Sequence, residues 1–201
     1  GKHLAKIMGG KARRIRDNTI DFLNSEKADN GELKKIMDVI KQHLVSDIDV
    51  NSFADMYAQT LVYGLFAARY NDKTSDTFTR QEARELVPAT NPFLQHFFDH
   101  IAGINFPKRL DTIVAELCEA FSHADVKSLM QEYFKKTNLW GKTYESPDPV
   151  IHFYEDFLQE YDPSKKMEMG VFYTPLPAVR FIIRGVDSIL KNEFGITRGL
   201  A

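Results

Sequence analysis

Residues 52–70 read SFADMYAQTLVYGLFAARY, a stretch in which apolar side chains occur almost all around the helical wheel. A helix that is apolar on every side is normally buried on every side, whereas a surface helix keeps a polar face. Asp55, Gln59 and Arg69 interrupt the apolar pattern, and buried polar groups need hydrogen-bond partners inside the protein. Gly64 allows a neighbouring helix to approach closely. We therefore expect residues 52–70 to form the central buried helix of a bundle, with the three polar residues fixing helix register.

The rest of the chain also carries helical patterns, with apolar residues three and four positions apart. Helices are predicted over residues 2–24, 32–45, 79–87, 91–102, 108–121, 125–136, 148–161 and 174–194. The Gly9–Gly10 pair is expected to break or fray the first helix, because glycine is a poor helix former. Thr79 followed by Glu82 is a capping-box candidate. Residues 137–147 are predicted to be a loop, and no segment alternates convincingly as a strand, so the fold class is all-α, a multi-helix bundle.

The composition is that of a globular protein from a reducing compartment. Among 201 residues, 43% are hydrophobic and 27% are charged, which is too apolar for a disordered chain. The single cysteine, Cys118, excludes a disulfide framework. No apolar run approaches the roughly 18 residues of a membrane-spanning helix, and the net charge of −2 excludes a general polycation. We expect a cytoplasmic location and no membrane partner.

One block near the C-terminus carries a functional signal. Residues 170–175 read GVFYTP and are followed by an apolar helix. The block resembles the cofactor-binding motif G-x-[FY]-[FY]-T-P at the front of adenine-specific, amino-methylating DNA methyltransferases. Residues 53–69 and 90–94 are similar to the segment upstream of the methylase in single-chain restriction–modification enzymes, the type I single-polypeptide and type II G-like groups. The resemblance implies that S-adenosylmethionine is the cofactor and that its site includes Phe172, Tyr173, Thr174 and Pro175.

The chemistry of this block suits the amino-acid end of S-adenosylmethionine. A helix N-terminus offers free amide groups and a positive dipole end to a carboxylate. Thr174 would add a hydroxyl donor at that point, Pro175 would begin the helix, and Phe172 and Tyr173 would wall the cofactor. The alternative is that Thr174–Pro175 is only a good helix start.

Two motifs of the same family are absent from the chain. They are the Gly-rich F-x-G-x-G loop and the catalytic [NDS]-P-P-[YFW] tetrapeptide that holds the flipped adenine. Asn91–Leu94 reads NPFL and lacks the second proline. The resemblance therefore implies a fragment upstream of a missing α/β methyltransferase core, with no catalytic residue and no activity by itself.

By the resemblance, the chain has two regions. Residues 1–140 would be a helical connector or coupler, and residues 141–201 the leading helices of the methyltransferase domain. In the intact protein the partners would be double-stranded DNA, an upstream nuclease or motor, and the downstream methylase core and target-recognition domains. Without its core, the last helix should expose an apolar face built from Val179, Ile182, Ile183, Val186 and Leu190. The alternative function is a non-enzymatic helical module for protein interaction or DNA binding.

Several other residue clusters are candidate sites. A basic helical face near the N-terminus is a candidate for contacts to DNA phosphates, the alternative being a solvated face. Its members are Lys6, Lys11, Arg13, Arg14 and Arg16. His96 and His100 have metal-ligand spacing, but no further ligand is evident and we predict no metal site. His152 lies outside any catalytic motif, and Cys118 is expected to fill the core.

Overall fold

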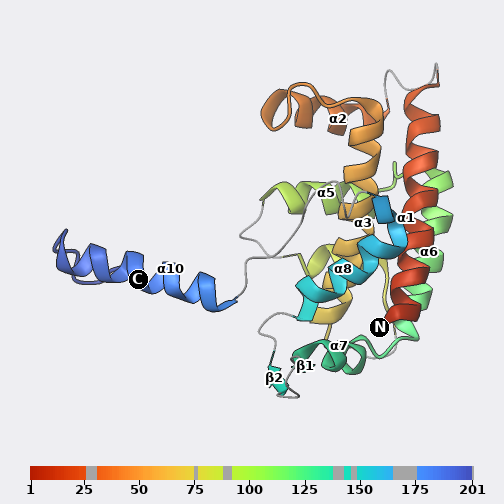
Figure 1. The fold of residues 1–201 in the computed structure, drawn as a ribbon. Coiled ribbons are helices and arrows are strands. Elements are labelled where there is room, and N and C mark those ends of the chain that lie inside the picture. Colours follow the sequence, from red (N-terminus) through yellow and green to blue (C-terminus); the bar gives the residue numbers. More distant parts are fainter. Residues whose placement is uncertain are drawn as a thin grey trace. The chain divides into compact units, whose positions relative to one another are not determined.

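The computed structural model describes residues 1–25, 31–74, 77–87, 92–137, 143–145, 149–164 and 176–200. The chain forms two compact units, Gly1–Pro163 and Ser164–Ala201, which are described separately. The elements of the first unit (Figure 1) are α1 (Lys2–Leu23), α2 (Glu32–His43), α3 (Val50–Asn71), α4 (Arg80–Glu85), α5 (Pro92–Ala102), α6 (Lys108–Ser122), α7 (Val126–Phe134), β1 (Lys135–Thr137), β2 (Thr143–Glu145) and α8 (Pro149–Tyr161). The second unit contains α10 (Leu176–Asn192). The predicted all-α multi-helix bundle is confirmed.

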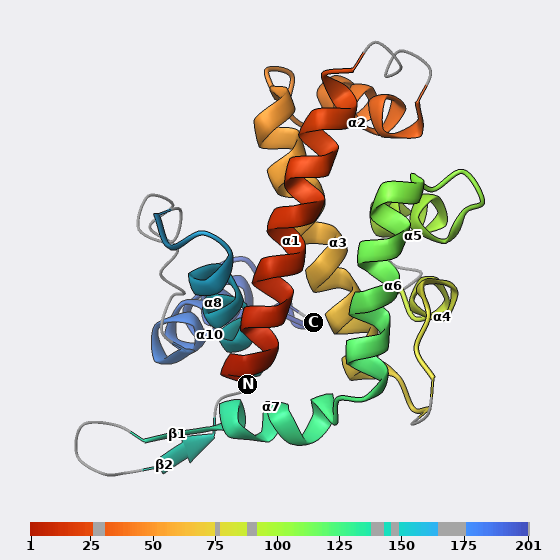
Figure 2. The ribbon, with the colours of Figure 1, turned by 90° about the vertical axis from the view of Figure 1, so that its right-hand side faces the viewer.

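The centre of the first unit is α3, as its apolar pattern predicts. In Figure 2, α1 crosses in front of α3, with α6 along one side of α1 and α8 along the other. Phe53, Leu61 and Phe66 on different sides of α3 are completely buried. The ring of Phe66 lies 4.5 Å from that of Phe153 in α8, measured between centroids. Burial on all sides explains why this helix has no polar stripe.

The predicted break at Gly9–Gly10 is wrong, because α1 is continuous through both residues. A Cβ atom at Gly9 would lie only 2.8 Å from the carbonyl carbon of Glu160 and 2.9 Å from the amide nitrogen of Tyr161, whereas a Cβ atom at Gly10 would meet no atom of another element within 4 Å. Gly9 is thus the place where the backbones of α1 and α8 meet. Helix propensity disfavours each glycine by about 1 kcal/mol, and tertiary packing overrides this cost.

A short hairpin occupies part of the predicted 137–147 loop. α7 ends at Phe134, and β1 then pairs antiparallel with β2, Lys136 facing Tyr144 in the register. Strands of three residues are too short for alternation to be visible in a sequence.

The spatial division of the chain also differs from the predicted boundary at residue 140. α8 was expected in the second region, but it packs against α1 and α7 and so belongs to the first unit. Residues 137–147 have the composition of a domain linker, but the helices before and after them, α7 and α8, pack together. Whether residues 141–201 begin a methyltransferase domain stays a prediction.

The second unit contains an amphipathic helix. Ile182, Ile183 and Val186 are exposed, as expected for the predicted apolar face, while Val179 and Leu190 are half-buried. Phe181 and Ile189 are exposed as well. Within residues 176–200, no second helix covers this side of α10. No helix in the described parts of the chain is both long and apolar enough to cross a membrane.

The contrast between the two neighbouring glycines of α1 gives a direct test of the packing. Gly9→Ala should destabilise the protein by about 1–3 kcal/mol, because the new methyl group meets α8 backbone that cannot move aside cheaply. Gly10→Ala is the matched control and should stabilise the protein by about 0.5–1 kcal/mol, since alanine is the better helix former. Urea unfolding followed by circular dichroism measures both values. Equal effects of the two substitutions would contradict the close contact between α1 and α8.

Candidate functional site

The predicted cofactor-binding residues, Phe172, Tyr173, Thr174 and Pro175, lie outside the described residues. The element that follows them is described, because α10 begins at Leu176 directly after the block. The predicted helix start at Thr174–Pro175 is therefore consistent with the observed helix.

One side of α10 is polar. Arg180 and Arg184 are exposed one turn apart, and Lys191 forms an ion pair with Asp187 at 2.7 Å. Asp187 also accepts a hydrogen bond at 3.0 Å from the amide of Leu200, so the chain turns back beside the helix after its end. The bond from Lys191 is the main cause, followed by that from Leu200, of the lowered pKa of Asp187. Because its opposite side is apolar, α10 is amphipathic, as is typical of a helix that packs one side against other protein.

The predicted DNA-binding residues of α1 are engaged mainly within the protein. Lys11 and Arg14 both pair with Glu116 of α6, Arg14 at 3.3 Å, and the hydrogen bond and charge of Lys11 lower the pKa of that carboxyl. Arg16 forms an ion pair with Asp17 at 2.9 Å. Among the described residues, none forms an ion pair with the exposed Lys6. These contacts favour a structural role for the basic face, and binding of DNA to it stays a prediction.

Arg13, the remaining member of the predicted basic face, reaches α8. Its Nη1 donates hydrogen bonds to the backbone carbonyls of Glu160 and Tyr161, the second at 3.1 Å. The last carbonyls of a helix have no partner within the helix, and a cation near them is favourable because of the helix dipole. Arg13 therefore caps the C-terminal end of α8.

A buried polar network joins α3 to α8. The hydroxyl of Tyr161 donates to Asp55 Oδ1 at 2.6 Å, and Gln59 Nε2 donates to Asp55 Oδ2 at 2.9 Å. Gln59 Oε1 in turn accepts a hydrogen bond from the Tyr154 hydroxyl at 2.8 Å. Burial, and then the Asp55 carboxylate, raise the pKa of Tyr161, which keeps the phenol protonated as a donor. The prediction that Asp55 and Gln59 find internal partners is confirmed.

Arg69, at the other end of α3, is buried and also has internal partners. Its Nε donates to the Phe121 carbonyl at 3.1 Å, and its Nη1 donates to Asp72 Oδ2 at 2.6 Å. Burial of Asp72 opposes its ionisation, but hydrogen bonds from Thr74 and Arg69 outweigh this effect and lower its pKa. The hydrogen bond to Phe121 ties the end of α3 to α6, and the ion pair with Asp72 ties it to the loop after α3.

The two histidines with metal-ligand spacing do not share one environment. His96 is exposed, whereas His100 is partly buried and its Nε2 lies 3.2 Å from the hydroxyl of fully buried Tyr57. Burial lowers the pKa of His100, partly opposed by the charge of Glu32. The described residues include no group of three or more His, Cys, Asp or Glu side chains that could hold a metal ion.

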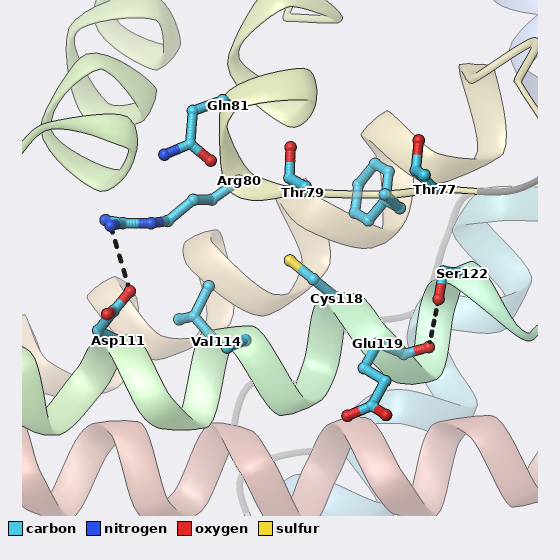
Figure 3. Close-up of a pocket in the computed structure, with 11 residues that line it drawn as sticks. Thr77, Thr79, Arg80, Gln81, Asp111, Val114, Cys118, Glu119 and Ser122 are labelled. Atoms are coloured by element: carbon cyan, nitrogen blue, oxygen red, sulfur yellow. Dashed lines mark hydrogen bonds and ion pairs between the residues drawn. The ribbon is translucent and has the colours of Figure 1, made fainter.

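A cavity of about 430 Å³ lies between residues 77–81 and α6 (Figure 3), and no pattern in the sequence indicates it. Arg80 closes one end through a 3.2 Å ion pair with Asp111. Thr79 and Glu82 form the predicted capping box of α4, and Thr77 also donates to Glu82. These polar side chains are already used in structural hydrogen bonds and ion pairs.

Cys118 lines the same cavity and is predominantly a thiol. Its side chain is buried, as predicted for a residue that fills the core, and burial raises its pKa to about 12. A thiol with such a pKa is a poor nucleophile. The cavity therefore does not bring together the groups of an acid–base or nucleophilic site.

Comparisons with known proteins identify no relative. No protein-family model, curated protein or solved structure matches the chain.

The buried contact between His100 and Tyr57 predicts a pH dependence of stability. Because the pKa of His100 is lowered in the folded state, the unfolded chain takes up a proton at this residue more readily. The contribution of neutral His100 to stability is complete well above pH 6.5, the ordinary pKa of an imidazole, and is lost as the pH falls below that value. Urea unfolding of the wild type and of His100→Gln at pH 7.5 and 5.5 separates the effect of His100 on stability from that of the other histidines. The variant should lose less stability on acidification, and an identical loss would contradict the prediction.

The buried thiol predicts a reactivity that depends on folding. At pH 8 Cys118 should react with a thiol reagent such as DTNB roughly a thousandfold more slowly in the native protein than in concentrated urea, because both the thiolate fraction and access are reduced. The unfolded chain is the control, since the protein contains no other cysteine. Rapid labelling of the native protein would show that Cys118 is accessible and ionisable.

Proposed function

We propose that the chain is part of an adenine-specific DNA methyltransferase of the single-chain restriction–modification kind. The observation that carries the proposal is the GVFYTP block at residues 170–175, placed directly before an amphipathic helix, α10. The reaction would be direct transfer of a methyl group from S-adenosylmethionine to the amino group of adenine in DNA. A cytoplasmic location and double-stranded DNA as partner belong to the same proposal.

In this proposal the second unit contributes one edge of the cofactor site. The Thr174 hydroxyl and the amides that follow it hold the cofactor carboxylate, because a helix N-terminus favours an anion. Phe172 and Tyr173 form an aromatic wall, and Pro175 begins the helix without using a donor. The catalytic tetrapeptide that receives the adenine would belong to a region beyond Ala201.

The exposed side of α10 supports this assignment. Ile182, Ile183 and Val186 are more than 40% exposed, which is unusual for a row of large apolar residues. A methyltransferase sheet beyond Ala201 would cover the row, and the first unit would serve as the connector between an upstream nuclease or motor and this core. A non-enzymatic interaction module would bury the same face against a partner protein.

The reading frame beyond Ala201 separates these two functions. The methyltransferase proposal requires a Gly-rich loop after a strand within a few tens of residues, followed by an [NDS]-P-P-[YFW] tetrapeptide. A stop codon or an unrelated domain there would favour the interaction module.

Thr174→Val tests the proposed cofactor contact in the intact gene product. Valine keeps the shape but removes the hydroxyl, and the loss of a hydrogen bond to a charged group, worth about 1.5–3 kcal/mol, should raise the Kd for S-adenosylmethionine roughly ten- to a hundredfold. Thr174→Ser keeps the hydroxyl and is the control. Calorimetric titration measures the affinities, and undiminished binding and DNA modification by the valine variant would overturn the assignment. The isolated chain should bind the cofactor weakly or not at all.

A further inference from the structure

The last turn of α8 is held by three residues on one side of α1. Gly9, Arg13 and Arg16 follow one another at spacings of four and three residues, which places them on the same helix face. Gly9 touches the backbone of Glu160 and Tyr161. Arg13 donates to the carbonyls of the same two residues, and the guanidinium of Arg16 lies 5.6 Å from the centre of the Tyr161 ring.

The same turn is also fixed from α3. The hydroxyl of Tyr161 reaches Asp55, whose second oxygen accepts from Gln59 within α3. Tyr161 is 1% exposed and Asp55 6%, so little water competes for these bonds. The end of α8 is consequently held by backbone contact, by a cap on its carbonyls and by a buried hydrogen bond.

The earlier part of α8 is placed by apolar packing and by its own hydrogen bonds, from Tyr133 to Asp156 at 2.6 Å and from Tyr154 to Gln59 at 2.8 Å. Phe153 and Phe157 are completely buried, and their rings lie within 6.4 Å of that of Tyr63. Arg13 acts only at the C-terminal end of the helix, from which the chain continues towards residues 172–175. We therefore expect Arg13 to fix the direction of the end of α8 and to contribute little to packing of the core.

We propose that Arg13 is a positioning residue that fixes the last turn of α8 and so the point from which the chain leads to the cofactor block. The link to the cofactor block rests on the proposed function. The role replaces contact with DNA phosphate for Arg13, because its Nη1 is already bound to the end of α8.

Hydrogen exchange of the 201-residue chain is the first test. Arg13→Met should increase amide exchange in peptides covering residues 158–163 at least tenfold and leave α3 unchanged. Arg14→Met is the matched control: it removes the neighbouring cation, which pairs with Glu116 on α6, and should not alter exchange at the end of α8. Exchange that is unchanged in Arg13→Met, or raised equally throughout α1, α3 and α8, would overturn the local role.

A distance measurement separates positioning from general stability. Spin labels at Gln159→Cys in α8 and Glu119→Cys in α6, in a Cys118→Ser background, should give a narrow distance distribution. Arg13→Met should broaden it, Arg14→Met should not, and Arg13→Lys, which keeps a cationic donor, should restore part of the narrow population. A distribution that stays narrow in Arg13→Met would overturn the proposal.

The intact gene product connects this role to the cofactor. Arg13→Met should raise the KM for S-adenosylmethionine several-fold with kcat unchanged. If the wild type transfers methyl groups and the variant has an unaltered KM, the link from Arg13 to the cofactor fails while the methyltransferase proposal stands. If the wild type has no such activity, the methyltransferase proposal fails together with that link, and the exchange and distance measurements still decide whether Arg13 holds α8.

Discussion

The fold of the first unit depends on burying α3 together with the carboxylate of Asp55. An ionised carboxylate inside a protein is costly unless hydrogen bonds replace water. Tyr161 and Gln59 provide these bonds, and Tyr161 comes from α8, more than a hundred residues away in the sequence. The central helix can therefore keep a polar residue only when α8 is in place, which couples an early and a late part of the chain.

The contacts of α1 follow from the same arrangement. Because α8 lies against α3 through Tyr161, its backbone comes close to α1, and only a glycine fits at the crossing. The last carbonyls of α8, which have no partner within the helix, accept hydrogen bonds from Arg13. Of the basic face, Arg13 and Arg16 thus contact α8, while Lys11 and Arg14 pair with Glu116 of α6.

Helix periodicity was sufficient to predict the helical class and the central place of residues 52–70. Periodicity describes each helix separately, so it does not show that Gly9 lies against α8, and a glycine pair by itself predicts a break. The three-residue strands are shorter than the repeat needed to recognise them. The compact units divide after residue 163 and not at residue 140, and composition does not show that α8 packs back onto α1.

Local sequence patterns also fail to predict which distant residues surround a candidate site residue. His96 and His100 have the spacing of metal ligands, but their environments differ, since His100 faces Tyr57 and His96 faces solvent. For Arg13, the sequence gives charge but not the distant carbonyls that this charge meets. The exposed face of α10 was predictable, because its periodicity is strong and does not depend on distant residues.

The assignment of the C-terminal unit to a cofactor site is tested most directly by photochemical cross-linking of radiolabelled S-adenosylmethionine to the intact gene product. Proteolysis and mass spectrometry then locate the label. We expect label in the peptide that contains Phe172–Pro175, and loss of this label when unlabelled cofactor competes. Specific label found only in other peptides, or none that unlabelled cofactor displaces, would contradict it.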